Sequence, residues 1–458
     1  MGSRIFGENS LNSIRSVGAA SVTICLSLAG FAPGIGAAAI SDDQVAVDRQ
    51  AVAVFAMPSV QAEKSRLRAL YVEDPEASQQ DGRARLEAGL GSVAFASVLA
   101  AANNDPDRPK ISWATAATHD WRALHVPGSG HGIDNPDNFY RNIPIDGAAR
   151  YTITGRIRQD GPLQESFTLY KTRPGSGGTE KQAVFEGSPV LGALTARDLS
   201  VASDGSFTIT IDHDGANGPG NHIQSGDNPD EILIVRDTLS DWSKERPNGL
   251  AVARADGPPL KPQPTNKVIA EQAIQLMRSM VPFWLKFDND YIYAHPANVI
   301  ETPRRRDGGW GFAVMARFDL KPDEALVVTL DPAGARYLGF QIADPWSVAP
   351  DYIRHTSSLN NHQAAPSADG SFTYVLCPRD PGYRNWIDSV GMHAGLITLR
   401  WQELTDKTVS PDHAIRSVKV VKLSQLKGAM PSEVQLLSAF QRRIQLADRA
   451  RSYALRLD

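Results

Sequence analysis

The chain has 458 residues, of which 42% are hydrophobic and 21% charged, and its formal net charge at pH 7 is −4. This balance is that of an ordinary globular protein, and it gives no global attraction to nucleic acid or to anionic lipid, both of which require a basic face. A chain of this length has room for two or three domains.

The first 39 residues have the pattern of a secretory signal. Arg4 and Arg15 precede an apolar run from Val17 to Ala32, and a row of small residues ends at Ala39. The run is short for a membrane span, so we expect cleavage and no stable span afterwards, with a retained single anchor as the alternative. The remaining chain holds one cysteine, Cys377, and therefore no internal disulfide. These features predict a protein of the periplasm or a secreted protein.

The next segments alternate between helical and β patterns. Residues 40–118 are rich in Ala, Gln, Glu and Arg with helical spacing of apolar positions, which predicts a helical leader. Residues 119–256 contain runs such as YTITGRI and EILIVRD that alternate apolar and polar residues, which predicts a first β-sandwich. Residues 257–295 begin with a proline-rich linker and continue as a helix, with Ile269, Ala273 and Met277 on one face.

The β pattern returns in residues 296–425, and residues 426–458 predict a C-terminal helix. We expect this helix to begin after an N-cap at Ser432 and to pack through an apolar stripe. The stripe consists of Leu436, Leu437, Phe440, Ile444 and Ala447.

The two β regions look like copies of one unit. In both copies fifteen residues separate an asparagine, Asn221 or Asn385, from a strand arginine, Arg236 or Arg400. Four ordered matches support a duplication: ARYTITGRI from Ala149 with ARYLGFQI from Ala335, DGSF from Asp204 with DGSF from Asp369, NHI with NWI, and ILIVRDTL from Ile232 with LITLRWQEL from Leu396. The expected fold is therefore mainly β with accessory helices, built from two tandem duplicated antiparallel sandwiches of the jelly-roll kind.

Two long strings resemble a known family. DEALVVTLDPAGARYLGFQIADPW and the later DPGYRNWID resemble bacterial proteins grouped as domain of unknown function 1214, which often occurs with domain 1254. GIDNPDNFYRNIPIDGAARYTITGRI is similar to the first part of the β region in those proteins. The resemblance covers about residues 119–402 and is strongest from Asp323 to Trp401. It implies tandem β-sandwiches on an exported protein, and it implies no reaction.

Residues 130–147, GHGIDNPDNFYRNIPIDG, gather the side chains that are best suited to chemistry. Neighbouring carboxylates, an imidazole and a phenol can share acid–base work when burial separates their pKa values. The candidate catalytic residues are His131, Asp134, Asp137, Tyr140 and Arg141. The first three could also hold a divalent cation. The alternative is a polar turn that leads into a strand, since DNPD recurs at residues 227–230 directly before ILIVRD.

A second set of residues could bind a ligand. The indoles of Trp346 and Trp386 could stack on sugar or aromatic rings, and Arg305, in a run of three arginines, could recognise a carboxylate or sulfate. Asn385 completes this set, although its equivalence to Asn221 favours a turn-forming role in both copies. The alternatives are buried aromatic rings and a solvated arginine loop.

No strong catalytic signature occurs in the chain, such as GxSxG, HExxH, a Walker-type loop or CxxC. The expected function is action on a small-molecule or carbohydrate-like ligand by a hydrolase or lyase with an acid–base or metal-assisted site. The alternative function is a non-catalytic ligand-binding or envelope scaffolding module.

Overall fold

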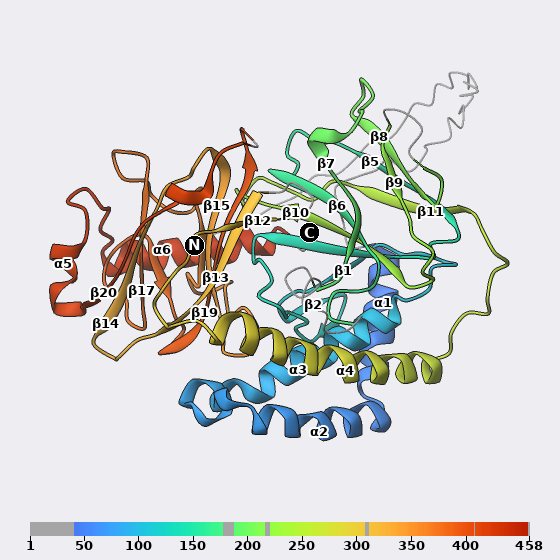
Figure 1. The fold of residues 1–458 in the computed structure, drawn as a ribbon, viewed down its shortest axis with the longest axis horizontal. Helices are drawn as coiled ribbons and strands as arrows, with labels where there is room; N and C mark the ends of the chain where they lie inside the picture. The colour runs from blue at the N-terminus through green and yellow to red at the C-terminus, as the bar shows by residue number, and fades with distance from the viewer. Residues whose placement is uncertain (1–40, 177–186, 216–219, 307–310, 407, 457–458) are drawn as a thin grey trace, which may run out of the picture. The chain divides into compact units, whose positions relative to one another are not determined.

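Helices form the first part of the described chain (Figure 1). The computed structural model describes residues 41–176, 187–215, 220–306, 311–406 and 408–456, so the predicted signal lies outside the described residues. The first three helices are α1 (Asp42–Phe55), α2 (Pro58–Glu73) and α3 (Gln80–Ala102). The Ser41 side chain caps α1 by accepting a hydrogen bond from the Gln44 N–H, which satisfies one otherwise unpaired donor.

The apolar helix α3 forms the centre of this helical layer. It is long and apolar enough to cross a membrane, but 72% of its most apolar window is buried inside the protein, as in the core helix of a globular protein. It packs against α4 (Asn266–Asp288), the helix predicted after the proline-rich linker. The predicted leader was too long, because α3 ends at Ala102 and strand β1 (Ser112–Ala114) already joins the first sandwich.

The first sandwich consists of a five-stranded and a four-stranded sheet. The five-stranded sheet has the order β1, β4 (Asn138–Ile145), β10 (Glu231–Thr238), β6 (Gln164–Tyr170) and β7 (Val190–Thr195). The four-stranded sheet has the order β11 (Leu250–Asp256), β5 (Arg150–Arg156), β8 (Ser206–Asp212) and β9 (His222–Gln224). Isoleucine, leucine, valine and aromatic side chains of both sheets fill the space between them.

The second sandwich likewise consists of a five-stranded and a four-stranded sheet. Its five-stranded sheet has the order β12 (Arg304–Arg305), β13 (Gly311–Asp319), β19 (Ala394–Leu404), β15 (Ala335–Ala343) and β16 (Ser358–Asn360). Its four-stranded sheet has the order β18 (Trp386–Asp388), β17 (Phe372–Cys377), β14 (Glu324–Leu330) and β20 (Ile415–Lys422). A short hairpin, β2 (His119–Trp121) with β3 (Leu124–Val126), lies between β1 and β4 in the chain.

Strands correspond one to one between the sandwiches. Each strand from β4 to β11 has a counterpart among β13 to β20 at the same place in the strand order. The pairs β8–β9 and β17–β18 are both parallel. The mainly β fold of two sandwiches with accessory helices is therefore confirmed, and the shared order agrees with the predicted duplication. One of the four matches was wrong: β5, which holds the first ARY string, corresponds to β14, whereas the second ARY string opens β15, the counterpart of β6. Alternating strands resemble one another, so a three-residue string cannot distinguish neighbouring strands.

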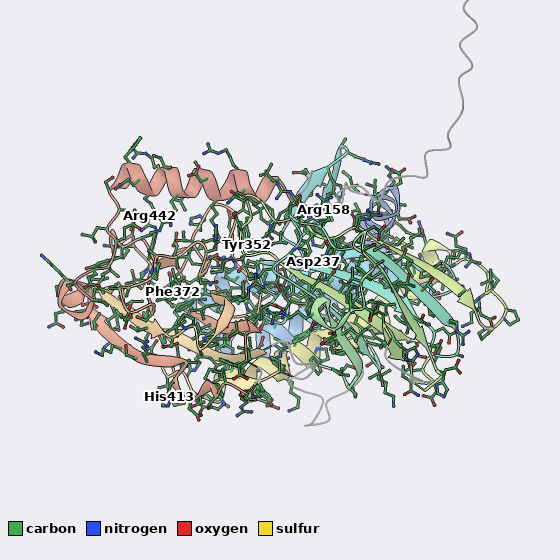
Figure 2. The ribbon with its side chains drawn as sticks, turned by 90° about the horizontal axis from the view of Figure 1, so that it is seen from above. Arg158, Asp237, Tyr352, Phe372, His413 and Arg442 are labelled. Atoms are coloured by element: carbon green, nitrogen blue, oxygen red, sulfur yellow. The ribbon has the colours of Figure 1, made fainter. Side chains whose placement is uncertain are left out.

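The C-terminal helix α6 (Ala439–Ala454) contradicts the prediction for its packing face. Its N-cap is Ser438, which forms a capping box with Gln441, rather than Ser432. Leu436 and Phe440 of the predicted stripe are each 63% exposed, and Ile444 is 44% exposed. The buried positions are instead Arg442, Arg449 and Tyr453. Figure 2 labels Arg442 beside this helix.

Aromatic rings explain why α6 buries arginines. The Arg449 guanidinium lies 4.3 Å from the centre of the Trp242 ring, and the Arg442 guanidinium lies 5.1 Å from that of Trp386. A guanidinium over an aromatic face is attracted by the ring quadrupole. Hydrogen bonds add to this attraction, since Arg442 pairs with Asp380 at 2.9 Å and Arg449 donates to Ser358 Oγ at 2.8 Å. The helix thereby contacts residues of both sandwiches.

Candidate functional site

A cavity of about 160 Å³ is lined by residues from both five-stranded sheets, from α3 and α4, and from residues 129–134. Alternation along the strands directs the side chains to it. In β10 Leu233 and Val235 belong to the core of the first sandwich, so Arg236 points away from that core. In β19 Leu399 belongs to the core of the second sandwich, and Arg400 points away from it toward the cavity. The volume is close to that of a cavity of about 150 Å³ that holds a benzene molecule. A ligand the size of one ring therefore fits.

One wall of the cavity is apolar. It is formed by Leu99 of α3, by Met280, Trp284 and Phe287 of α4, and by Met315 of β13. His131 contacts this wall, because its ring meets that of Trp284 edge to face with 5.5 Å between the ring centres. Such a wall suits an alkyl or aryl group.

Four arginines and a single carboxylic acid are among the described residues that line the cavity. The arginines are Arg173, Arg236, Arg306 and Arg400, and the acid is Asp134. Arg236 and Arg400 occupy equivalent positions of β10 and β19, so each sandwich contributes one of the pair. The cavity therefore has a strong excess of positive charge, which favours an anionic ligand.

The arginines differ in their partners. The Arg400 guanidinium donates to Gln341 Oε1 and to the Ile133 carbonyl, and burial lowers its pKa. Arg236 donates to the Tyr170 hydroxyl at 3.1 Å. Burial lowers the pKa of Arg173 to about 10, and its guanidinium makes no hydrogen bond or ion pair with a residue that the structure describes.

His131 is held as a neutral base. Its Nδ1 lies 2.9 Å from the Ser129 carbonyl oxygen, which only accepts, so Nδ1 carries the proton and Nε2 keeps a free electron pair. Burial, and to a smaller extent the charge of Arg173, lower the pKa of His131 to about 4. At neutral pH the imidazole therefore carries no charge.

Asp134 is held as a weak acid. It is only 6% exposed, and burial raises the pKa of its carboxyl group to about 7, although Arg400 and the N–H groups of residues 134 and 131 lower it. Its Oδ1 atom has no hydrogen-bond partner among the described residues. Tyr140, on the same side of the cavity, accepts a hydrogen bond from the Asn135 N–H at 2.8 Å, so its own hydroxyl proton remains available.

His131, Asp134 and Tyr140 of the predicted catalytic set thus line one cavity, but Asp137 and Arg141 do not. Asp137 accepts hydrogen bonds from the Trp242 indole at 2.7 Å, the Tyr337 hydroxyl at 2.6 Å and the Asn360 amide at 3.1 Å. This set of donors saturates the Asp137 carboxylate and gives it a structural role.

Arg141 follows Tyr140 on β4 and therefore points to the opposite face, into the first sandwich. There it donates to Asp237 at 2.8 Å, to Glu165 at 3.0 Å and to the Asn248 carbonyl at 2.7 Å. Figure 2 labels Asp237 among the strands of this sandwich. Arg141 is thus part of a buried ionic cluster and has no access to the cavity.

The predicted metal set of His131, Asp134 and Asp137 is not assembled. Among the described residues, no three His, Cys, Asp or Glu side chains gather closely enough to hold a metal ion. The reason is local, because the carboxylate of Asp137 is turned toward Trp242 while that of Asp134 lines the cavity.

The predicted ligand-binding set is dispersed. Trp346 is buried and donates to the Gly82 carbonyl at 2.8 Å, and Trp386 is buried and donates to the Cys377 carbonyl at 2.9 Å. Arg305 lies exposed on edge strand β12 and donates to the Val409 carbonyl. The indoles therefore serve the core, and the member of the arginine run that reaches the cavity is Arg306.

Asn385 forms a turn, as its equivalence to Asn221 indicated. Its side chain accepts from the Ala365 N–H and donates to the Ala365 carbonyl, and Asn221 makes the same two bonds with Ser200. The shared geometry shows a structural role in both copies.

Sequence reasoning did not identify the arginines as cavity residues. A usable signal was present for Arg236 and Arg400, because each interrupts an apolar strand, ILIVRD or LITLRW, on the face that alternation turns away from the core. Arg173 follows β6 in a loop and gives no comparable signal.

Comparisons with known proteins place the fold but not the chemistry. No family model matches the chain, and no curated protein matches it. A solved structure of an uncharacterised protein from Burkholderia cenocepacia is similar, with a TM-score of 0.62 at 23% identity, covering 82% of this chain and 99% of that one. A protein from Vibrio parahaemolyticus has a TM-score of 0.39 at 10% identity, covering 63% of this chain and 90% of that one. The Burkholderia structure shows that the same fold occurs elsewhere.

Proposed function

We propose that this protein binds a small organic anion, a carboxylate with an apolar body, in the cavity between the two five-stranded sheets. The observation that carries the proposal is Arg173, whose guanidinium lies at the cavity without a partner among the described residues. A half-buried guanidinium at a cavity is a suitable partner for a carboxylate, because the two groups form charge-assisted hydrogen bonds.

The remaining lining supports the same class of ligand. Asp134, the acid among the lining residues, is partly protonated near neutral pH and so compensates little of the positive charge. Trp284 and Phe287 supply apolar lining to the same cavity. A polyhydroxylated sugar would leave many hydroxyl groups against that lining, so an alkyl or aryl carboxylate fits better than the carbohydrate-like ligand that we also considered.

A reaction by proton transfer, of the hydrolase or lyase type, is the second candidate function. It is favoured by the pairing of an unprotonated His131 Nε2 with an Asp134 carboxyl group whose pKa is about 7. Two titratable groups held in opposite protonation states are suited to act as base and acid at neutral pH.

Cellular location forms part of the proposal. The signal-like pattern of residues 1–39 and the resemblance to domain 1214 proteins both support export to the periplasm or beyond.

Calorimetric titration of the purified protein with benzoate and with benzamide tests the binding proposal. The two probes have nearly the same size, but benzamide carries no charge. We expect benzoate to bind and benzamide to bind at least about tenfold more weakly, because hydrogen bonds to a charged group contribute about 1.5–3 kcal/mol.

Arg173→Met should weaken benzoate binding by about tenfold or more for the same reason. Arg305→Met is the matched control, since Arg305 is an exposed arginine outside the cavity, and it should leave the affinity unchanged. Equal binding of benzoate and benzamide, or no binding of either, would contradict the proposal.

The catalytic candidate has a separate test. Phenylacetate has protons next to its carboxylate, and NMR in D2O would show their exchange if His131 removes one of them. Exchange that disappears in His131→Gln supports an enzyme, whereas binding without exchange leaves the binding function alone.

A further inference from the structure

We infer that the ligand carries a hydrogen-bond donor, a hydroxyl or ammonium group beside its carboxylate, and that the Asp134 carboxyl group receives it. This inference rests on the proposed function and specifies its ligand class. The structure assigns the donor to Asp134 through an unpaired atom, through the orientation of the neighbouring donors and through the space around it.

The unpaired atom is Asp134 Oδ1. The residue is 6% exposed and lines the cavity, and Oδ1 has no hydrogen-bond partner among the described residues. Nearly all buried polar atoms in proteins are paired, because leaving one unpaired costs about 1–3 kcal/mol. An unpaired oxygen at a cavity therefore indicates that the partner comes from the ligand.

The neighbouring protein donors are directed elsewhere. Gln341 Nε2 donates to the backbone carbonyl of Asp134 at 2.6 Å, and Arg400 donates to the backbone carbonyl of Ile133. No ion pair within 4.0 Å joins Arg400 to Asp134. Two strong donors thus hold the backbone of residues 133 and 134, and the Asp134 carboxyl group is left facing the cavity.

Asp137 shows that this arrangement is not a general property of the segment. Three residues after Asp134, it accepts three hydrogen bonds from Trp242, Tyr337 and Asn360. The fold therefore saturates one carboxylate of the DNPD string with side-chain donors and leaves the Oδ1 atom of the other unpaired among the described residues.

Because Gly130 has no side chain, it leaves room for the Asp134 carboxyl group. A Cβ atom at Gly130 would lie 3.0 Å from Asp134 Oδ1, so a larger residue there would crowd the carboxyl group. The Gly130 backbone is fixed to α3, because Ser92 Oγ donates to its carbonyl at 2.7 Å. The surroundings therefore hold the carboxyl group in place and leave its Oδ1 atom without a hydrogen-bond partner among the described residues.

The complete lining defines a ligand class. Arg173 and Arg400 would receive the carboxylate, Asp134 a nearby hydroxyl or ammonium group, and Trp284 with Phe287 an apolar side group. The class is a 2-hydroxy or 2-amino acid with an apolar side chain. The two donors are distinguishable, since an ammonium group needs ionised Asp134 and a hydroxyl group can pair with either protonation state.

Calorimetry with three probes of similar size tests the inference without mutation: phenylacetate, mandelate and 2-phenylglycine, each at pH 6 and pH 8. For a hydroxyl ligand, mandelate should bind about tenfold or more tightly than phenylacetate at both pH values. For an ammonium ligand, phenylglycine should gain affinity from pH 6 to pH 8. If phenylacetate binds and neither analogue binds more tightly, the inference is overturned while the proposed function stands. If none of the three binds, the proposed function itself fails.

Two substitutions assign the effect to Asp134. Asp134→Ala should remove the preference for both analogues over phenylacetate. Asp134→Asn keeps an accepting oxygen without charge, so it should remove the preference for phenylglycine and retain that for mandelate. Asp120→Asn, at an exposed aspartate in the hairpin of β2 and β3, is the control and should change neither preference. A preference that survives in a folded Asp134→Ala protein would exclude Asp134 as the receiving group.

Discussion

Inside the first sandwich, where β4, β6 and β10 lie side by side, the inward-facing side chains at one end are Arg141, Glu165 and Asp237. At the equivalent places of β13, β15 and β19, counted from Arg236 and Arg400, the second sandwich holds apolar residues. These are Val314, Leu338 and Trp401, all buried in its core. One strand order therefore accommodates either three interacting charges or three packed apolar side chains at the same site.

The ionic cluster of the first sandwich is more sensitive to single substitutions than the apolar residues at the same place in the second sandwich. Burial raises the pKa of Asp237, the nearby charge of Glu165 raises it further, and the guanidinium of Arg141 lowers it. A buried ionic cluster often contributes no more stability than apolar residues of the same volume, but removing one member leaves an uncompensated buried charge. We expect the two sandwiches to differ most in their response to single substitutions.

Removing the cation should have the largest effect. Arg141→Met leaves Glu165 and Asp237 buried without their shared donor, so the free energy of unfolding should fall by about 3–5 kcal/mol. Chemical denaturation measures this change. The matched control is Leu338→Met, at the position equivalent to Glu165, where a volume-conserving exchange should cost less than about 1.5 kcal/mol. Similar losses in the two proteins would show that the cluster is not a special point of weakness.

A second contrast concerns two aspartates with opposite pH behaviour. The pKa of Asp134 is raised from 3.8 to about 7, so the stability that its protonated form contributes is present below about pH 4 and is lost as the pH rises through about 7. Asp134→Asn lacks this loss. Relative to the wild type it should gain up to about 4 kcal/mol of unfolding free energy between pH 4 and pH 8.

Asp369, in the second sandwich, provides the control for that measurement. Hydrogen bonds from the Ser371 hydroxyl and N–H groups lower its pKa to about 2, so its contribution is present above about pH 4 and is lost as the pH falls through about 2. The difference between wild type and Asp369→Asn should be constant from pH 5 to pH 8. A constant difference for Asp134→Asn as well would contradict the assigned state of Asp134.

The turn asparagines give a smaller contrast. Asn385 is buried and makes a third bond, to the Thr373 carbonyl at 3.1 Å, whereas Asn221 is half-buried. Asn385→Ala should therefore cost about 2–3 kcal/mol of unfolding free energy, and Asn221→Ala about 1 kcal/mol. Equal costs, measured by denaturation, would mean that burial does not decide the strength of this turn.

The smallest net change is expected when the whole ionic cluster is replaced. In the protein that combines Arg141→Met, Glu165→Leu and Asp237→Leu, the buried charges are gone, although Asn248 loses two partners. These effects oppose each other, so stability should stay within about 2 kcal/mol of the wild type. A triple variant as unstable as Arg141→Met alone would show that the charges themselves stabilise the first sandwich.

Much of the fold could be predicted from local pattern. Alternation of apolar and polar residues located the strands of both sandwiches, and the equal spacing from Asn221 to Arg236 and from Asn385 to Arg400 identified corresponding strands. The helix α6 could not be predicted in the same way. Its buried face is chosen by partners far along the chain, such as the Trp242 ring under Arg449, and an apolar stripe gives no information about them.

The candidate site was predicted in part for the same reason. His131, Asp134 and Tyr140 come from one stretch of sequence, so their gathering at one cavity could be proposed locally. The arginines of the cavity arrive from loops and strands of both sandwiches, and only the packing of one sheet against the other brings Arg236 and Arg400 to the same space. Asp137 was indistinguishable from Asp134 until its three donors were known.

The contact between the C-terminal segment and the DNPD string has a consequence for how the protein is made. Arg456 donates to the Pro136 carbonyl at 2.7 Å across 320 residues of sequence. At about 5–20 residues per second, residue 136 leaves the ribosome on the order of half a minute before residue 456 exists. Throughout that interval the turn at Pro136 lacks the hydrogen bond from Arg456. A chain that completes this site so late can close it only when its last segment arrives.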